Sequence, residues 1–254
     1  VNGGTTSNRV AGNYIGTDAS GTTAIANSDF GMLIDNNTNN NIIGTNSDGV
    51  SDFYERNIIS GNGRSGIRVD SGANNNVIAG NFFGTDATGL SSVGNSEHGI
   101  QLRCSANNNQ VCTNGDGVQD FLERNVISGN GGPGMRLDCQ SYDNMISGNF
   151  IGLNASISAA LPNNGGILLF NSRGNNLIGG TTPVMGNIIS GNNTYGLRID
   201  AGSQNPNTVS RNYIGTASAL NDFANTTNGI ELNVNGSGSP TTNIDNNYIF
   251  YHSG

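Results

Sequence analysis

The sequence has no lysine and no tryptophan, and only 11 % of its 254 residues are charged, against roughly 25 % in an average soluble domain. All ten positive charges are arginines, and 18 acidic residues leave a net charge of −8. Such a chain has no basic patch that would neutralise phosphates, so we expect no nucleic-acid partner. Its apolar runs are too short to span a membrane, and Val1 does not begin a signal peptide, so we expect no membrane insertion.

Asparagine and glycine are unusually frequent in this sequence. There are 45 asparagines and 39 glycines. Both are poor helix formers that tolerate left-handed turns. Only five prolines and many short β-branched runs argue against disorder. The composition therefore predicts an all-β fold with many tight corners.

The chain repeats itself at two periods. The segment 10–18 (VAGNYIGTD) recurs at 78–86, 146–154 and 209–217, in steps of 68, 68 and 63 residues. Within this period, a glycine followed by alternating apolar residues recurs every 30 to 35 residues, at 31–34, 66–69, 99–102, 134–137, 166–169, 196–199 and 229–232.

Each of these strands is followed by an asparagine-rich corner and a second short strand. A strand with period-2 alternation buries one face, and stacked coils of such strands share one core. We therefore predict a single domain over residues 1–254, a right-handed parallel β-helix of about seven to eight coils with decorating loops. Stacked strands make such a rod roughly 35–40 Å long.

Asparagines occupy the corners of the predicted coils. A corner residue must turn the chain and hydrogen-bond the backbone, and equivalent residues in stacked coils form amide ladders. We predict this structural role for Asn13, Asn62, Asn81, Asn130, Asn149, Asn192 and Asn212.

The repeated motifs resemble a known group of proteins. They are Gly-Asn-Phe/Tyr-Ile-Gly-Thr-Asp, Arg-Asn-Ile-Ile-Ser-Gly-Asn at 56–62, and Gly-Ile-x-Ile/Leu. Together they resemble the parallel β-helix repeats of large secreted or surface proteins of bacteria and archaea, over essentially the whole chain. The resemblance implies the fold but does not select a function. The same architecture carries pectin and alginate lyases, epimerases, phage tailspikes, adhesins and filament subunits.

The most specific local motif is a duplicated loop, at 44–55 and 112–123. Aligned with a twelve-residue calcium loop, both copies have glycine at position 6, but position 1 is Gly44 or Cys112 instead of aspartate. The alternative to a calcium site is an acidic turn in which each glutamate pairs with the arginine after it. The candidate ligands at positions 3, 5, 7, 9 and 12 are Asn46, Asp48, Val50, Asp52 and Glu55, and Asn114, Asp116, Val118, Asp120 and Glu123.

The exposed face of the glycine-led strands carries a second pattern. Arginine and aspartate, two residues apart, recur in alternate coils. A polysaccharide lyase of this fold would use an arginine or lysine base beside acidic residues that hold calcium against a uronate. The predicted surface contact ladder comprises Arg68, Asp70, Arg136, Asp138, Arg198 and Asp200.

Repetition argues against catalysis on this face, because an active site is a single departure from a repeat. Lysine is absent, His98 lies in a loop, and His252 lies among the last four residues. The Asp-Pro-His-Glu run of the alginate epimerases is also absent. We therefore expect no catalytic residue here, and interpret the ladder as surface ion pairs, with glycan contact as an alternative.

The positions of the cysteines indicate whether the protein belongs to an oxidising compartment. Cys104 and Cys139 occupy the same register in successive coils, which would place their Cα atoms about 4.8 Å apart, within disulfide range. A disulfide would imply an oxidising exterior. The alternative is two stacked free thiols. Cys112 has no partner in either interpretation.

Five sequons would accept N-glycans on a secreted chain. Asparagine, serine and threonine are so frequent here that chance alone produces several. The candidate acceptors are Asn36, Asn154, Asn192, Asn225 and Asn235.

Two classes of function follow from these patterns. The preferred one is a non-catalytic, extracellular or cell-surface β-helix rod, structural or adhesive, for which calcium binding and glycan contact are further hypotheses. Residues 1–6 already match 177–182, so we expect self-association end to end or neighbouring domains of a longer chain. The alternative is a polysaccharide-active enzyme, lyase-like or epimerase-like, of the same fold.

Overall fold

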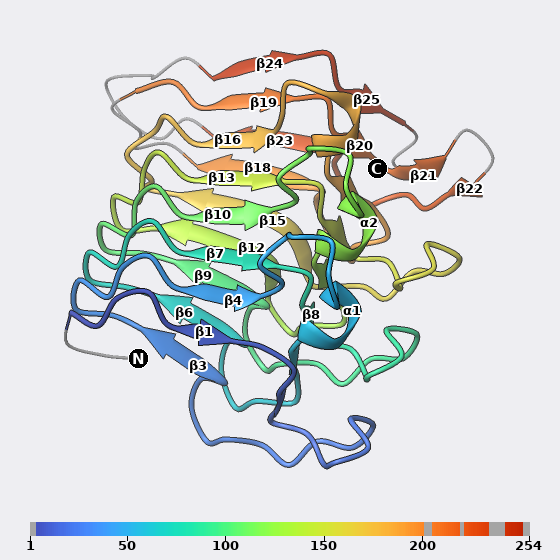
Figure 1. Ribbon diagram of the computed structural model, residues 1–254. Coiled ribbons are helices and arrows are strands. Elements are labelled where there is room, and N and C mark those ends of the chain that lie inside the picture. Colours follow the sequence, from blue (N-terminus) through green and yellow to red (C-terminus); the bar gives the residue numbers. More distant parts are fainter. Residues whose placement is uncertain (1–3, 201–204, 219–220, 234–241, 251–254) are drawn as a thin grey trace.

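The computed structural model describes residues 4–200, 205–218, 221–233 and 242–250, and its strands wind into a parallel β-helix of about seven turns (Figure 1). Each turn contributes one strand to each of three sheets, and every pairing between turns is parallel. This confirms the predicted fold. Among the described residues, no helix is both long enough and apolar enough to cross a membrane.

The first sheet is built from the strands that follow the asparagine-rich corners. Adjacent strands pair in register, for example Ile43 with Ile78. Its strands in spatial order are β1 (Arg9–Val10), β4 (Ile42–Gly44), β7 (Val77–Ala79), β10 (Gln110–Cys112), β13 (Met145–Ser147), β16 (Leu177–Gly179), β19 (Thr208–Ser210) and β24 (Asn243–Asp245).

The second sheet consists of two-residue strands, each preceded by an asparagine. These strands are β2 (Tyr14–Ile15), β5 (Ile58–Ile59), β8 (Phe82–Phe83), β11 (Val126–Ile127), β14 (Phe150–Ile151), β17 (Ile188–Ile189), β20 (Tyr213–Ile214) and β25 (Tyr248–Ile249).

The third sheet contains all seven of the predicted glycine-led strands. In β6, Ile67 and Val69 are fully buried in the core, whereas Arg68 between them points outward. The alternation therefore places apolar side chains inside the coil and charged ones on its surface. The strands are β3 (Met32–Ile34), β6 (Ile67–Val69), β9 (Ile100–Leu102), β12 (Pro133–Asp138), β15 (Gly165–Phe170), β18 (Leu197–Asp200) and β23 (Ile230–Asn233).

Asparagine side chains form three ladders along the helix, one at each corner. At each step the side-chain amide Nδ2 donates a hydrogen bond to Oδ1 of the asparagine in the next turn. From Asn41 through Asn76 and Asn109 to Asn144, these Nδ2–Oδ1 distances are 2.8–3.2 Å. The predicted asparagines all belong to two of these ladders, which confirms their structural role. The ladders run through Asn8, Asn41, Asn76, Asn109, Asn144, Asn176 and Asn207; through Asn13, Asn57, Asn81, Asn125, Asn149, Asn187, Asn212 and Asn247; and through Asn27, Asn62, Asn95, Asn130, Asn163, Asn192 and Asn225.

The burial of these amides corrects part of the glycosylation prediction. Asn192 and Asn225 are fully enclosed ladder members, and Asn154 accepts hydrogen bonds from two backbone amides of its own turn. A glycan on any of the three would require opening the fold. Asn36 is exposed, and Asn235 lies outside the described residues.

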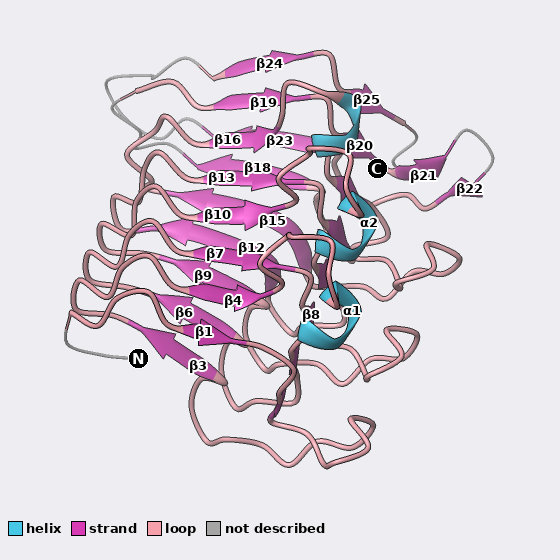
Figure 2. Ribbon diagram, in the orientation of Figure 1, coloured by secondary structure: helices cyan, strands magenta, loops and turns pink. Residues whose placement is uncertain are grey.

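Insertions between the strands carry the helices. The duplicated loops end in one-turn helices, α1 (Asp52–Glu55) and α2 (Asp120–Glu123), which the sequence analysis did not predict; η1 (Pro183–Met185) lies in a shorter insertion two turns further on. Figure 2 shows α1 and α2 one above the other on the same side of the β-helix, and Gln119 Nε2 donates to Gly49 O between the two loops. Beyond them, an antiparallel pair, β21 (Thr216–Ser218) and β22 (Asn221–Asp222), projects from the solenoid.

Candidate functional site

The outward face of the third sheet carries the predicted arginine–aspartate pairs. Arg68 forms an ion pair with Asp70, and the corresponding pairs in β12 and β18 have N–O distances of 2.6 and 2.8 Å. The strands β6, β12 and β18 belong to alternate turns, as predicted. Each pair lies within one strand, so each charge has its partner beside it.

The two turns that lie between these pairs differ from each other: β15 carries Leu168 and Phe170 at the paired positions, whereas β9 carries an amide and a guanidinium. Gln101 occupies the place of the arginine, and Arg103 occupies the place of the aspartate. Arg103 Nε lies 3.7 Å from Asp70 Oδ2 and 3.8 Å from Asp138 Oδ1, and Gln101 Nε2 donates to Asp138 Oδ2 at 3.1 Å. Arg103 therefore links the pairs of the turns on either side of it.

A surface depression of about 370 Å³ lies over Gln101 and Arg103. It is polar and carries both signs of charge. Its lining residues are Arg64, Glu97, His98, Gln101, Arg103, Arg136, Asp138, Cys139, Phe170 and Asn171.

His98 is the histidine of this depression. Burial lowers its pKa below the ordinary value of 6.5, and the charge of Arg136 lowers it further. Its ring hydrogen-bonds the Pro133 backbone, and Nδ1 is buried beneath Gly132 with no hydrogen-bond partner in the described part of the chain. His98 is therefore neutral near pH 7 and has one free basic nitrogen.

Tyr195 lies on the other side of Arg136, in the same register position as His98. Its ring fills the space that a side chain at Gly165 would take. Burial raises the pKa of Tyr195 to about 12, and Arg136 is among the charges that act on it. The phenol is thus protonated, and the guanidinium of Arg136 lies within electrostatic reach of both a neutral imidazole and a protonated phenol.

The duplicated loops form a different kind of site. In the second loop, one carboxylate oxygen from each of Asp116, Asp120 and Glu123 lies within 4.8 Å of the others. Asn114, instead of pointing toward a shared centre, donates from Nδ2 to Asp116 Oδ2 at 3.1 Å. Three of the predicted ligands are therefore brought together, in a cluster that could hold a metal ion.

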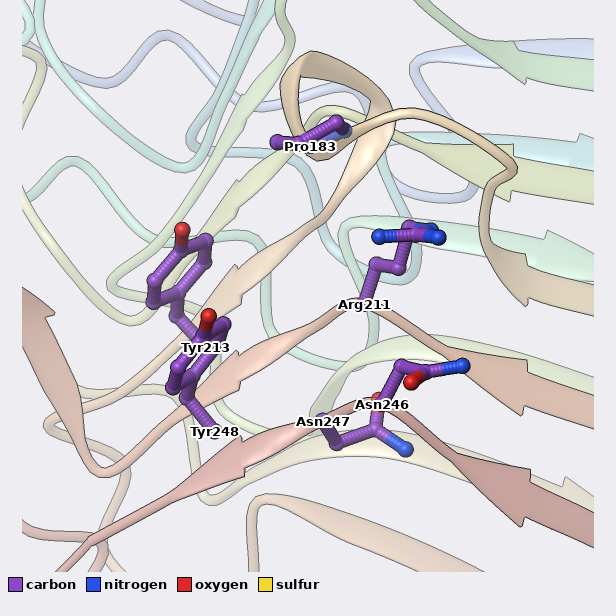
Figure 3. Close-up of a pocket in the computed structure, with 6 residues that line it drawn as sticks. All are labelled: Pro183, Arg211, Tyr213, Asn246, Asn247 and Tyr248. Carbon is purple, nitrogen blue, oxygen red and sulfur yellow. The ribbon is translucent and has the colours of Figure 1, made fainter.

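A second depression, of about 320 Å³, lies at the end of the second sheet (Figure 3). Tyr213 and Tyr248 stack there with centroids 5.0 Å apart and planes within 8°. Figure 3 shows Arg211 and Asn246 on the other side of the depression, away from the rings. It offers an aromatic surface and one arginine, and its described lining contains no carboxylate and no histidine.

No family model matches the chain, and none of the curated proteins does. Among solved structures it is similar to a double mutant of the periplasmic alginate epimerase AlgG (18 % identity, TM-score 0.56, 87 % of this chain and 48 % of that one). A further AlgG structure is 16 % identical with a TM-score of 0.50, and the match covers 87 % of this chain and 51 % of that one. The Azotobacter vinelandii mannuronan C-5 epimerase AlgE4 A-module is 17 % identical with a TM-score of 0.48, and the match covers 85 % of this chain and 54 % of that one. The chain spans about half the length of these proteins. The AlgG likeness supports the parallel β-helix fold.

Sequence reasoning missed two members of the candidate site. His98 was set aside as a loop residue, and Tyr195 was not considered. Both stand directly before the glycine that leads a strand, the position that Phe30, Ser65 and Pro133 hold in other turns. Comparing this position between turns identifies His98 and Tyr195 as its two titratable residues.

Proposed function

We propose that this protein acts on an acidic polysaccharide that lies across the third sheet at β9, in an extracellular or periplasmic compartment. The observation that carries the proposal is the polar turn of Gln101 and Arg103 between two arginine–aspartate pairs, with a depression over it. The AlgG structures support it only through their fold.

The depression has the chemistry that binds uronate sugars. Arg64, Arg103 and Arg136 line it, and guanidinium groups bind carboxylates with two parallel hydrogen bonds. Phe170 is 46 % exposed at its rim, with Arg136 5.3 Å from the ring centroid. An exposed ring offers the apolar face of a sugar a flat surface to pack against.

The proposed reaction is removal of the proton on the carbon next to the uronate carboxylate. Arg136 neutralises the carboxylate and so stabilises the negative charge that develops there. Neutral His98 accepts the proton once its ring turns the buried Nδ1 toward the depression, and Tyr195, still protonated, is the acid. Protonation of the glycosidic oxygen with loss of that bond gives chain cleavage, whereas return of a proton to the opposite face of the carbon gives epimerisation.

Activity assays on purified protein test this proposal. Pectate, alginate and other uronates are incubated with the protein and analysed for unsaturated product and for changed uronate stereochemistry. We expect turnover that His98→Gln and Tyr195→Phe each reduce by roughly 100-fold or more, while Tyr142→Phe, whose ring packs against the Arg173 guanidinium, leaves it unchanged. Full activity in both site variants would exclude these residues as acid and base.

A non-catalytic rod is the second candidate. It is favoured by the ion pairs of β6, β12 and β18, which already neutralise most of the charge on this face. Uronate binding without turnover, together with end-to-end filaments in electron micrographs, would support this candidate over the enzyme.

We also propose that calcium binds at the carboxylates of Asp116, Asp120 and Glu123. Hard oxygen ligands with several negative charges suit calcium. The cluster lies in an insertion between the first and second sheets, whereas the depression lies on the third. Calcium therefore has a stabilising role in this proposal and takes no part in the reaction.

A further inference from the structure

Given the proposed calcium site, we infer that the acidic side chains of the two duplicated loops are neutralised by different cations. The guanidinium of Arg9 neutralises those of the first loop, and one calcium ion neutralises those of the second. The protein then binds a single ion per chain, although its sequence contains two nearly identical loops.

The first loop contains its own cation. Arg9 Nη2 forms an ion pair with Glu55 Oε1, reaching the loop from the turn before it. The pKa of Arg9 is raised, first by its hydrogen bond with Glu55 and further by the charges of Glu55, Asp48 and Asp52. One guanidinium therefore contacts Glu55 and lies within electrostatic reach of Asp48 and Asp52. No three-acid cluster is found at this loop, all of whose residues lie in the described part of the chain.

The strand register shows what takes the place of Arg9 at the second loop. Arg9 pairs with Ile42, Ile42 with Val77, and Val77 with Gln110. The first loop follows β4 and the second follows β10, so the turn before the second loop presents Val77 where the turn before the first presents Arg9. Val77 has no charge to offer.

Other nearby cations do not replace the missing one. Arg124 follows α2 directly, but its Nη1 donates to Gly148 O at 2.7 Å and its Nη2 to Val184 O at 2.8 Å. Its guanidinium also lies 5.3 Å from the centroid of the Phe150 ring. Arg124 is thus turned toward the next insertion.

Glu123 shows the consequence. Its side chain is fully buried, and Oε2 accepts hydrogen bonds from Thr113 Oγ1 at 2.7 Å and from Asn114 N at 2.8 Å. Oε1 is also buried, but it has no hydrogen-bond partner within the described residues. A buried carboxylate oxygen without a partner is costly unless a cation compensates it.

Asp52 in the first loop makes a useful comparison. Asp52 is buried, and its Oδ1 accepts a hydrogen bond from Thr45 Oγ1 at 2.8 Å. Its Oδ2 accepts no hydrogen bond from the described residues. Its negative charge nevertheless has Arg9 as a neighbour. The two loops therefore carry the same acids, and they differ in whether the chain itself supplies the positive charge.

Isothermal titration of the chelator-treated full chain with calcium chloride tests the inference. The variants are Asp116→Asn, its first-loop counterpart Asp48→Asn, and Val77→Arg, which supplies the second loop with a guanidinium. Asp116 and Val77 are not fully buried, so their variants are suitable where Glu123→Gln fails to fold. Thermal unfolding with and without calcium provides a second readout for each variant.

We expect one ion per chain, with affinity at least about tenfold weaker in Asp116→Asn, because affinity depends on the number of charged ligands. Val77→Arg should abolish the binding and the thermal shift, and Asp48→Asn should leave both unchanged. Two ions per chain, or one ion lost in Asp48→Asn and kept in Asp116→Asn, would overturn the inference while calcium binding itself stands. No heat and no thermal shift at millimolar calcium would overturn both.

Discussion

Cys104 and Cys139 are joined by a disulfide between equivalent positions of successive turns, with their Cα atoms 4.5 Å apart. The bond closes a 35-residue separation in sequence. Cys104 directly follows Arg103 and Cys139 directly follows Asp138, so the disulfide joins the two turns beside the Arg103–Asp138 contact. The covalent bond and the Arg103–Asp138 contact therefore hold the same junction of the β-helix together.

Removing this disulfide should lower the free energy of unfolding by up to about 4 kcal/mol, the loop-closure value for a ring of this size. Denaturant unfolding of the Cys104→Ser/Cys139→Ser variant measures the effect. Reductant should bring the natural protein to the stability of this variant and should leave the variant unchanged. Equal stability of the two proteins without reductant would contradict the prediction.

The asparagine ladders predict a graded response to truncation. Asn125 is fully buried; its Oδ1 accepts from Asn81 N at 3.0 Å and from Asn81 Nδ2 at 3.2 Å. Asn125→Ala leaves buried donors without partners, so it should cost about 3 kcal/mol of unfolding free energy. Asn13 stands at the exposed end of the same ladder, and Asn13→Ala should cost about 1 kcal/mol or less. Equal losses would show that the ladder hydrogen bonds do not set the cost.

Much of this fold was predictable because its determinants are local and repeated. Ile67, Arg68 and Val69 alternate as the strand requires, and the same alternation recurs in every turn. The asparagine ladders followed from equivalence between turns. The assignment of asparagines to ladders was not predictable in the same way. Asn13 and Asn62 have similar sequence surroundings but belong to ladders at different corners of the coil.

The candidate sites were harder to predict because they depend on contacts between turns. Nothing near Glu55 in sequence identifies Arg9 as its partner, since the pairing needs the strand register and the path of the inserted loop. The same applies to Arg136, which is placed between His98 and Tyr195 by stacking. The one-turn helices α1 and α2 follow a residue in left-handed conformation, which glutamine and serine rarely adopt.

Cys112 should be inert in the folded protein. Its thiol is 2 % exposed, and burial raises its pKa to about 12, so almost no reactive thiolate exists at pH 8. A thiol reagent applied without reductant should label no cysteine in native protein and one cysteine after unfolding in denaturant. Labelling of two or more thiols in the unfolded, unreduced protein would show that Cys104 and Cys139 are not paired.

His98 should make stability fall as the solution is acidified. Its pKa in the folded protein lies below the 6.5 of an exposed histidine, first because of burial and then because of Arg136. Between those two pKa values the unfolded chain binds more protons than the folded one, so the free energy of unfolding rises with pH across that window. Above pH 6.5 the contribution is fully present, and below the folded pKa it is lost.

Denaturant unfolding from pH 7.5 to pH 5, with His98→Gln as the comparison, measures this dependence. The natural protein should lose stability relative to the variant as the pH falls through 6.5, because only the natural side chain must be protonated in a buried position. The difference should persist at high salt, since burial is the main cause of the shift and burial is not screened. Parallel pH profiles for the two proteins would mean that His98 titrates like an exposed histidine and is charged at pH 6, which would also remove it as the neutral base of the proposed reaction.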